Sequence, residues 1–104
     1  AFTLGFIQEA LLMYENAIAK GPANAQLYFG KGVILSKMLR HNDAIQAYSN
    51  CIQLDPFMAD AYVNRGNEYS QLKLWNLALQ DYQDAIKIDP HNEMAKHNIR
   101  ELNK

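Results

Sequence analysis

The sequence predicts an all-α fold in which six helices form antiparallel pairs that stack into a solenoid. Three observations predict it: a period of 34 residues, a helical spacing of apolar side chains within each period, and prolines between periods. The period links four sets of identical residues: Pro22, Pro56 and Pro90; Ala10, Ala44 and Ala78; Tyr14, Tyr48 and Tyr82; Ile18, Ile52 and Ile86. Helical repeats of this length stack on their neighbours and bury a continuous core.

The second helix of each period carries an apolar stripe. In the middle period the stripe contains Ala44, Ile45, Tyr48, Cys51 and Ile52, and the same offsets recur one period earlier and one period later. These spacings bring the side chains to one face of an α-helix, whereas a strand would alternate apolar and polar residues. The stripe therefore predicts an amphipathic helix in each period.

The first helix of a period contains a glycine at a position that helices normally avoid. Gly32 lies between Tyr28 and Leu35 on one helix face, and Gly66 lies at the same place one period later. Glycine inside a helix costs about 1 kcal/mol relative to alanine. We therefore expect a close helix crossing there, at which any larger side chain would clash.

Proline dipeptides mark the junctions between periods. Asp55-Pro56 and Asp89-Pro90 end one helix and precede the next, because proline cannot continue a helix but fits its first turn. Gly21-Pro22 does the same at the first junction. The expected helices span residues 4–20, 24–38, 42–54, 58–72, 76–88 and 92–103.

Composition argues against several classes of protein. The 104 residues include 10 basic and 11 acidic side chains, and the net charge of −1 argues against binding to nucleic acid. No apolar run is long enough to insert into a membrane, and no signal-peptide pattern is seen. Cys51 is the only cysteine, so an internal disulfide is excluded. This is compatible with a reducing cytoplasm, the location that we expect.

The repeated residues resemble those of the tetratricopeptide repeat family over essentially the whole chain. The family pattern places W-x2-L-G-x2-Y, then A-x3-F, then P within about 34 residues. One unit matches it with Tyr28, Lys31, Gly32, Leu35, Ala44, Tyr48 and Pro56, and the next with Tyr62, Arg65, Gly66, Tyr69, Ala78, Tyr82 and Pro90. The resemblance implies a right-handed solenoid of helix-turn-helix units.

Lys31 and Arg65 depart from this pattern, which has leucine at both positions. A basic side chain can lay its aliphatic stem along the helix pair and extend its charge to the edge. We expect Arg65 to pair with Asp81 on the facing helix. Ala47 occupies the equivalent place opposite Lys31, so we expect no such partner for the lysine.

The phase of the repeat divides the single expected domain, residues 1–104, into four parts. Residues 1–24 supply the second helix of a partial repeat, 25–58 and 59–92 are whole repeats, and 93–104 form a capping helix. Lys96 and Arg100 replace the tyrosine and glycine of the earlier repeats in that last helix. A polar outer face of this kind closes a solenoid. We therefore interpret the chain as a fragment that is finished at its C-terminal end and open at its N-terminal end.

The partial repeat has an apolar helix without the first helix of its own unit. We expect Leu11, Tyr14 and Ile18 to form an exposed apolar patch through which the fragment self-associates as a homo-oligomer. The alternative is that this helix tolerates its exposure to solvent.

Few residues could support catalysis or metal binding. Cys51 lies at a small-residue position of the repeat, which is typical of core packing rather than of a nucleophile. His91 and His97 are six residues apart, so they lie on different helix faces and cannot share a metal ion. His41 lies in a polar turn, where a capping or surface role is expected. The sequence therefore predicts no enzyme, no metal site and no cofactor.

The family resemblance implies that the first helices line a concave face, and that this face binds a peptide or a helix of a partner protein. Nine residues on the outward faces of these helices are candidates for the binding groove: Phe29, Val33, Lys37, Val63, Asn64, Asn67, Gln71, His97 and Asn98. Three of them are apolar and would form a strip. The asparagine amides can bind a peptide backbone whatever its side chains are.

One variant of the family binds the C-terminal carboxylate of heat-shock chaperones with lysine, arginine and asparagine side chains. Asn64 matches one asparagine position, but Phe29, Val33, Met94 and Asn98 stand at the other positions. A carboxylate needs positive charge to offset its loss of solvation. We therefore do not expect a chaperone tail as the partner.

Three functions stay open on the sequence alone. The first is a protein-interaction module that binds a segment of another protein. The second is a structural domain that self-assembles through its first helix, and the third is an enzyme, for which no set of catalytic residues is found.

Overall fold

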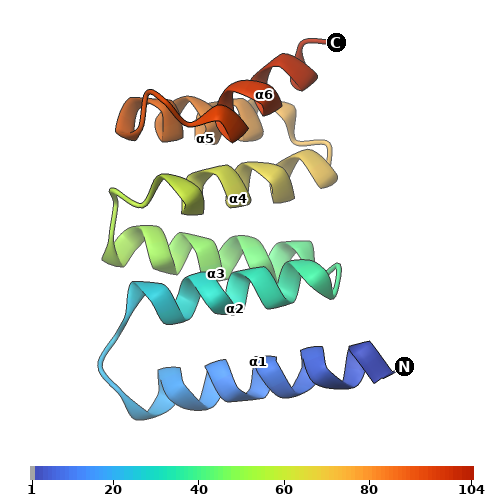
Figure 1. Ribbon diagram of the computed structural model, residues 1–104, viewed down its shortest axis with the longest axis vertical. Coiled ribbons are helices and arrows are strands. Elements are labelled where there is room, and N and C mark those ends of the chain that lie inside the picture. The colour runs from blue at the N-terminus through green and yellow to red at the C-terminus, as the bar shows by residue number, and fades with distance from the viewer. Residues whose placement is uncertain (1) are drawn as a thin grey trace.

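The structure, a computed structural model, describes the backbone of residues 2–104 and the side chains of residues 5–104. Its six helices confirm the predicted all-α fold, and each predicted helix end lies within two residues of the observed end. The helices are α1 (Phe2–Lys20), α2 (Ala25–Lys37), α3 (His41–Leu54), α4 (Ala59–Gln71), α5 (Trp75–Ile88) and α6 (Glu93–Leu102). They stack along the longest axis of the molecule, from α1 at one end to α6 at the other (Figure 1).

The apolar stripes of α3 and α5 form the centre of the core. Ala44 and Cys51 on α3, and Ala78 and Ala85 on α5, are completely buried. Small side chains at these positions allow the neighbouring helices to approach closely. None of the described helices is long and apolar enough to cross a membrane.

Gly32 and Gly66 lie at the close crossings that the sequence predicts. A Cβ atom at Gly32 would lie 2.5 Å from Cε1 of Tyr48, and one at Gly66 would lie 2.6 Å from Cε1 of Tyr82. Both tyrosines are buried in the core, so they have no room to move aside. Packing therefore requires glycine here and offsets its intrinsic helix penalty.

The turn after each complete first helix contains a residue with a left-handed backbone. Leu39 (φ 60°) and Lys73 (φ 62°) occupy the same place in the two repeats. In the first of these turns, Arg40 N donates to Leu35 O at 3.0 Å, and the second turn is closed in the same way. Glycine usually occupies this position at the end of a helix. Leucine and lysine are therefore strained there.

The ion pair expected between α4 and α5 is present. Arg65 donates from Nε to Oδ2 of Asp81 at 2.8 Å and from a terminal nitrogen to Oδ1 at 2.7 Å. Its other terminal nitrogen donates to Ser49 on α3 at 3.0 Å. The rings of Tyr62 and Tyr69 lie 5.7 and 5.8 Å from the guanidinium carbon. The hydrogen bonds with Asp81 raise the pKa of Arg65, so this side chain stays charged while it connects three helices.

Lys31 has no acid opposite it on the facing helix, as expected, but it has a partner on the preceding helix. Its Nζ lies 3.6 Å from Oε2 of Glu15 on α1. Glu15 occupies the position that Ser49 holds one repeat later, so the acid lies on the preceding helix rather than on the facing one. Ala47 supplies no carboxylate on the facing helix, and a cavity of about 310 Å³ is found among these side chains.

The apolar residues expected to form an exposed patch on α1 instead pack toward α2. Leu11 is 8% exposed and belongs to the core cluster of α2 and α3. The ring of Tyr14 lies against Gly30, and Ile18 is half-buried. The solenoid stack covers this stripe because α1 packs directly on α2. Among the side chains of α1 that the structure describes, residues 5–20, the large apolar ones that are exposed are Phe6, Leu12 and Met13, at 58%, 58% and 71%.

Candidate functional site

A groove of about 650 Å³ crosses α2, α4 and α6. These three helices share one register of the repeat, so the same face of each helix lines the groove. Six of the nine predicted groove residues line it: Val33, Lys37, Asn64, Asn67, Gln71 and Asn98. The structure therefore brings together residues that are distant in the sequence but equivalent in the repeat.

The other three predicted residues do not line the groove. Val63 is 2% exposed and belongs to the core cluster of α5 and α6. Phe29 packs edge-on against Tyr48, with ring centroids 5.9 Å apart. His97 is exposed outside the groove. Of the predicted apolar strip Phe29, Val33 and Val63, only Val33 lines the groove. The other two are lost from the strip because a first helix also packs against the repeats on both sides of it.

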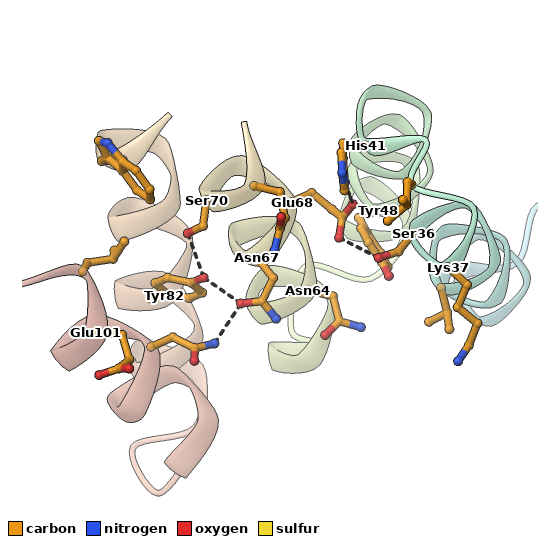
Figure 2. Close-up of a pocket in the computed structure, with 16 residues that line it drawn as sticks. Ser36, Lys37, His41, Tyr48, Asn64, Asn67, Glu68, Ser70, Tyr82 and Glu101 are labelled. Atoms are coloured by element: carbon orange, nitrogen blue, oxygen red, sulfur yellow. Dashed lines mark hydrogen bonds and ion pairs between the residues drawn. The ribbon is translucent and has the colours of Figure 1, made fainter. Parts of the chain in front are cut away.

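Asn67 lies at the centre of a hydrogen-bonded network on the groove floor. Its Oδ1 accepts from the hydroxyl of Tyr82 at 2.6 Å and from Nδ2 of Asn98 at 2.8 Å. The hydroxyls of Ser70 and Tyr82 are 3.2 Å apart, and Figure 2 shows this chain of contacts running from α6 to α4. The Nδ2 group of Asn67 has no partner within the described part of the chain. It is therefore available to donate to a ligand.

Asn64 binds a second buried tyrosine. Burial and the charge of Glu68 raise the pKa of Tyr48, a hydrogen bond with Asn64 lowers it, and the net result is a pKa of about 12. Tyr48 is therefore neutral at physiological pH. Asn64 occupies the position that Gly30 holds one repeat earlier, where the ring of Tyr14 fills the space.

The buried carboxylate of Glu68 is a groove residue that sequence reasoning missed. It is 4% exposed. Its Oε2 accepts from the hydroxyl of Ser36 and its Oε1 lies by Nδ1 of His41, both at 2.8 Å (Figure 2). His41 was expected to be a capping or surface residue. The available signal was that Glu68 replaces Ile34 of the preceding repeat, which places a charge at an apolar position.

Ser36, His41 and Glu68 do not form a catalytic triad. In a triad, histidine binds the serine hydroxyl and takes its proton, while the carboxylate orients the histidine. Here the carboxylate lies between the other two side chains and receives the serine hydroxyl itself. The serine is therefore held as a donor and is not activated as a nucleophile.

Leu39 and Trp75 are further groove residues that were not predicted. Both line the groove, and they are 75% and 52% exposed. Leu39 lies in the turn between α2 and α3, and Trp75 is the first residue of α5. Both positions lie outside the helical pattern from which the groove was predicted. They add exposed apolar surface to the groove.

The stack of helix pairs with a groove across its equivalent helices defines the class of helical-repeat solenoid proteins. Models of the tetratricopeptide repeat match residues 1–37, 25–57 and 59–92. The chain belongs to the tetratricopeptide repeat family. A comparison with curated proteins gave no match.

Solved structures with the same fold span nearly the whole chain. The second tetratricopeptide domain of human RPAP3, in complex with the HSP70 peptide SGPTIEEVD, is 26% identical with a TM-score of 0.90, covering 99% of this chain and 86% of that one. The first such domain of Spaghetti (RPAP3), bound to the HSP90 peptide SRMEEVD, is 22% identical with a TM-score of 0.91. The match covers 98% of this chain and 81% of that one. YrrB, a tetratricopeptide protein with an unusual peptide-binding site, is 24% identical with a TM-score of 0.86, covering 95% and 51%.

Proposed function

We propose that this chain is a protein-interaction module whose groove binds a segment of a partner protein. The observation that carries the proposal is the row of amide side chains, Asn64, Asn67 and Asn98, along a groove that crosses three equivalent helices. A neighbour at 26% identity was solved with a bound peptide, which supports peptide binding by this fold. The bonding of Ser36 and His41 to Glu68 supports binding rather than catalysis.

Asn67 is well arranged to bind a peptide backbone. Tyr82 and Asn98 hold its carbonyl oxygen, so the amide group has a fixed orientation. Its Nδ2 can donate to a peptide carbonyl oxygen. Because the side chain is already ordered, binding loses little rotamer entropy, and this preorganisation favours affinity.

The proposal is tested with a display library of short random peptides, selected on the immobilised domain. The Kd of a selected peptide is then measured for the wild type and for Asn64→Ala, which removes one amide from the groove. We expect about a fivefold weaker Kd for the variant, because one hydrogen bond is lost. Asn76→Ala is the matched control, since Asn76 is exposed on α5 and does not line the groove. Equal losses in the two variants, or no selected peptide, would contradict the proposal.

The second candidate function is self-association through α1. The observation that favours it is the exposure of Leu12 and Met13, two neighbouring apolar side chains on the end helix of the stack (Figure 1). This contact would be supported by the packing of α1 on α2 through Leu11, Tyr14 and Ile18, the residues that the sequence predicted for self-association.

A further inference from the structure

We infer that the groove binds an internal, uncharged segment of its partner and seats large apolar side chains of that segment against Leu39 and against Trp75. The inference rests on the proposed function, since it concerns the same groove. Both residues line the groove. Neither is among the nine positions that the repeat pattern indicates.

Leu39 contributes little to the stability of the fold. Its side chain is 75% exposed, and its backbone has a φ of 60°. This left-handed conformation is unfavourable for residues other than glycine. Strained backbone positions are enriched at ligand sites. Lys73 has the same backbone conformation in the next turn and does not line the groove, so this conformation alone does not mark a ligand site. The exposed leucine side chain in the groove lining is what points to a contact with a ligand.

Trp75 adds a second exposed apolar side chain to the groove. It is the only tryptophan of the chain and is 52% exposed at the start of α5. His41 holds the equivalent position one repeat earlier, where it is bound to Glu68. Leu39 lies in the turn before α3 and Trp75 begins α5, and both line one groove. Apolar side chains of a bound segment can therefore bury surface against each of them.

The charges of the groove disfavour an acidic segment or a C-terminal carboxylate. Lys37 is the one lysine or arginine among the described residues that line it, whereas Glu68 and Glu101 are both acids. His41 lies 2.8 Å from Glu68, and Glu101 lies 2.8 Å from Lys104. The groove therefore has no surplus of positive charge with which to offset the desolvation of a carboxylate.

The amide side chains of the groove floor are suited to bind the uncharged backbone of a peptide segment. Asn64 and the free Nδ2 of Asn67 lie beside Val33 on the same groove surface. Amide groups bind the carbonyl and N–H groups that every peptide segment has. The combination of an amide floor with exposed apolar side chains therefore fits an internal segment with a bulky aliphatic or aromatic residue.

Selection from two peptide libraries tests this inference. One library presents random segments with fixed chain on both sides, and the other presents random segments that end in a free carboxylate. The selected peptides are then synthesised with an acetylated N-terminus and either an amide or an acid at the C-terminus. We expect the amide form to bind at least as tightly as the acid and to contain a large apolar residue. We also expect the emission of Trp75 to shift to shorter wavelength on binding.

Leu39→Gly separates a binding role from a structural role. Glycine accepts the left-handed backbone, so we expect the melting temperature to stay unchanged or rise by up to about 5 °C. Loss of the leucine side chain should weaken the Kd about tenfold. Lys73→Gly is the matched control, because Lys73 has the same conformation in the next turn and does not line the groove. It should give the same change in melting temperature without a change in Kd.

Several results would overturn the inference. Binding that requires the free acid would identify a carboxylate-terminated tail as the ligand. Self-association that Leu39→Gly abolishes, with no peptide selected, would identify a second copy of the chain. An unchanged Kd in Leu39→Gly, together with a weaker one in Asn64→Ala, would overturn this inference and leave the proposed function standing. Unchanged affinity in both variants would overturn both.

Discussion

Two buried tyrosine hydroxyls join the core of each helix pair to the floor of the groove. Tyr82 donates to Asn67, and Tyr48 is hydrogen-bonded to Asn64. Burial raises the pKa of both phenols, that of Tyr48 from its ordinary value of 10.0 to about 12. Each phenol therefore stays neutral in the folded protein at a pH at which the unfolded chain would begin to lose its proton.

The raised pKa of Tyr48 predicts a loss of stability at alkaline pH. Below pH 10 this residue is protonated in both states, so it does not affect the pH dependence of folding. As the pH rises from about 10 to about 12, only the unfolded state releases the proton. The free energy of unfolding should therefore fall by about 2–3 kcal/mol through this group.

Urea denaturation across this pH range measures the effect. The midpoint should decrease with rising pH in the wild type, and Tyr48→Phe, which has no phenolic proton, should show a clearly smaller decrease. An equal decrease in both proteins would mean that Tyr48 titrates normally in the folded state.

The periodicity predicted groove residues but not the turn residues or the buried acid. Asn67 and Asn98 were found because equivalent positions on equivalent helices lie on one surface. Leu39 lies in a turn and Trp75 is the first residue of α5, outside the predicted helix 76–88, so the helical period carried no information about the orientation of either. Glu68 is held by Ser36, a contact between residues 32 apart that no local pattern contains. Such contacts depend on the distance between repeats, which the sequence does not provide.

At the scale of helices, two ion pairs with different partners stabilise equivalent places in the two repeats. Arg65 binds Asp81 on the facing helix in a bidentate pair, and the carboxylate side chain is 3% exposed. Lys31 lies 3.6 Å from Glu15 on the preceding helix, and the glutamate side chain is 47% exposed. The first pair is buried and the second lies in solvent, so their contributions to stability should differ.

We expect Asp81→Ala to lower the free energy of unfolding by about 2–4 kcal/mol, because it leaves the Arg65 charge without its carboxylate. Glu15→Ala should lower it by less than about 1 kcal/mol, as is usual for an exposed pair. Both values come from urea denaturation with a common slope.

A double variant distinguishes the loss of a contact from the burial of an unpaired charge. Asp81→Ala combined with Arg65→Leu restores the leucine of the family pattern and removes the charge. It should recover most of the lost stability, since a buried ion pair is often replaceable by apolar side chains. A double variant as unstable as Asp81→Ala would show that the charge is not the cause.

The helices were predicted closely because stripe, glycine and proline all repeat with one period. The partner of Lys31 was missed for a specific reason. Within its own helix pair Lys31 faces Ala47, which offers no acid of the kind that Asp81 offers Arg65. In the stack, a first helix also packs against the second helix before it, and α1 supplies Glu15 from that side. Position along the stack matters as much as position within the pair.

At the scale of the whole molecule, α1 ends the stack with exposed apolar surface. Leu12 and Met13 are 58% and 71% exposed, while the neighbouring Leu11 is 8% exposed and packed in the core. Adjacent exposed apolar residues are typical of interaction surfaces. We therefore predict that the chain self-associates through Leu12 and Met13, on the opposite side of α1 from the packing on α2.

The three consecutive side chains allow surface contact and core packing to be separated on one helix. Leu12→Glu combined with Met13→Glu should shift a concentration-dependent assembly to the monomer in sedimentation velocity, with little change in melting temperature, because both side chains lie in solvent. Leu11→Glu should instead destabilise the fold by about 3 kcal/mol or more, because it buries a charge without a partner. Leu39→Gly, at the groove edge, should leave the assembly unchanged. A wild type that sediments as a monomer at every concentration would contradict this prediction. It would mean that Leu12 and Met13 remain exposed to solvent without driving association.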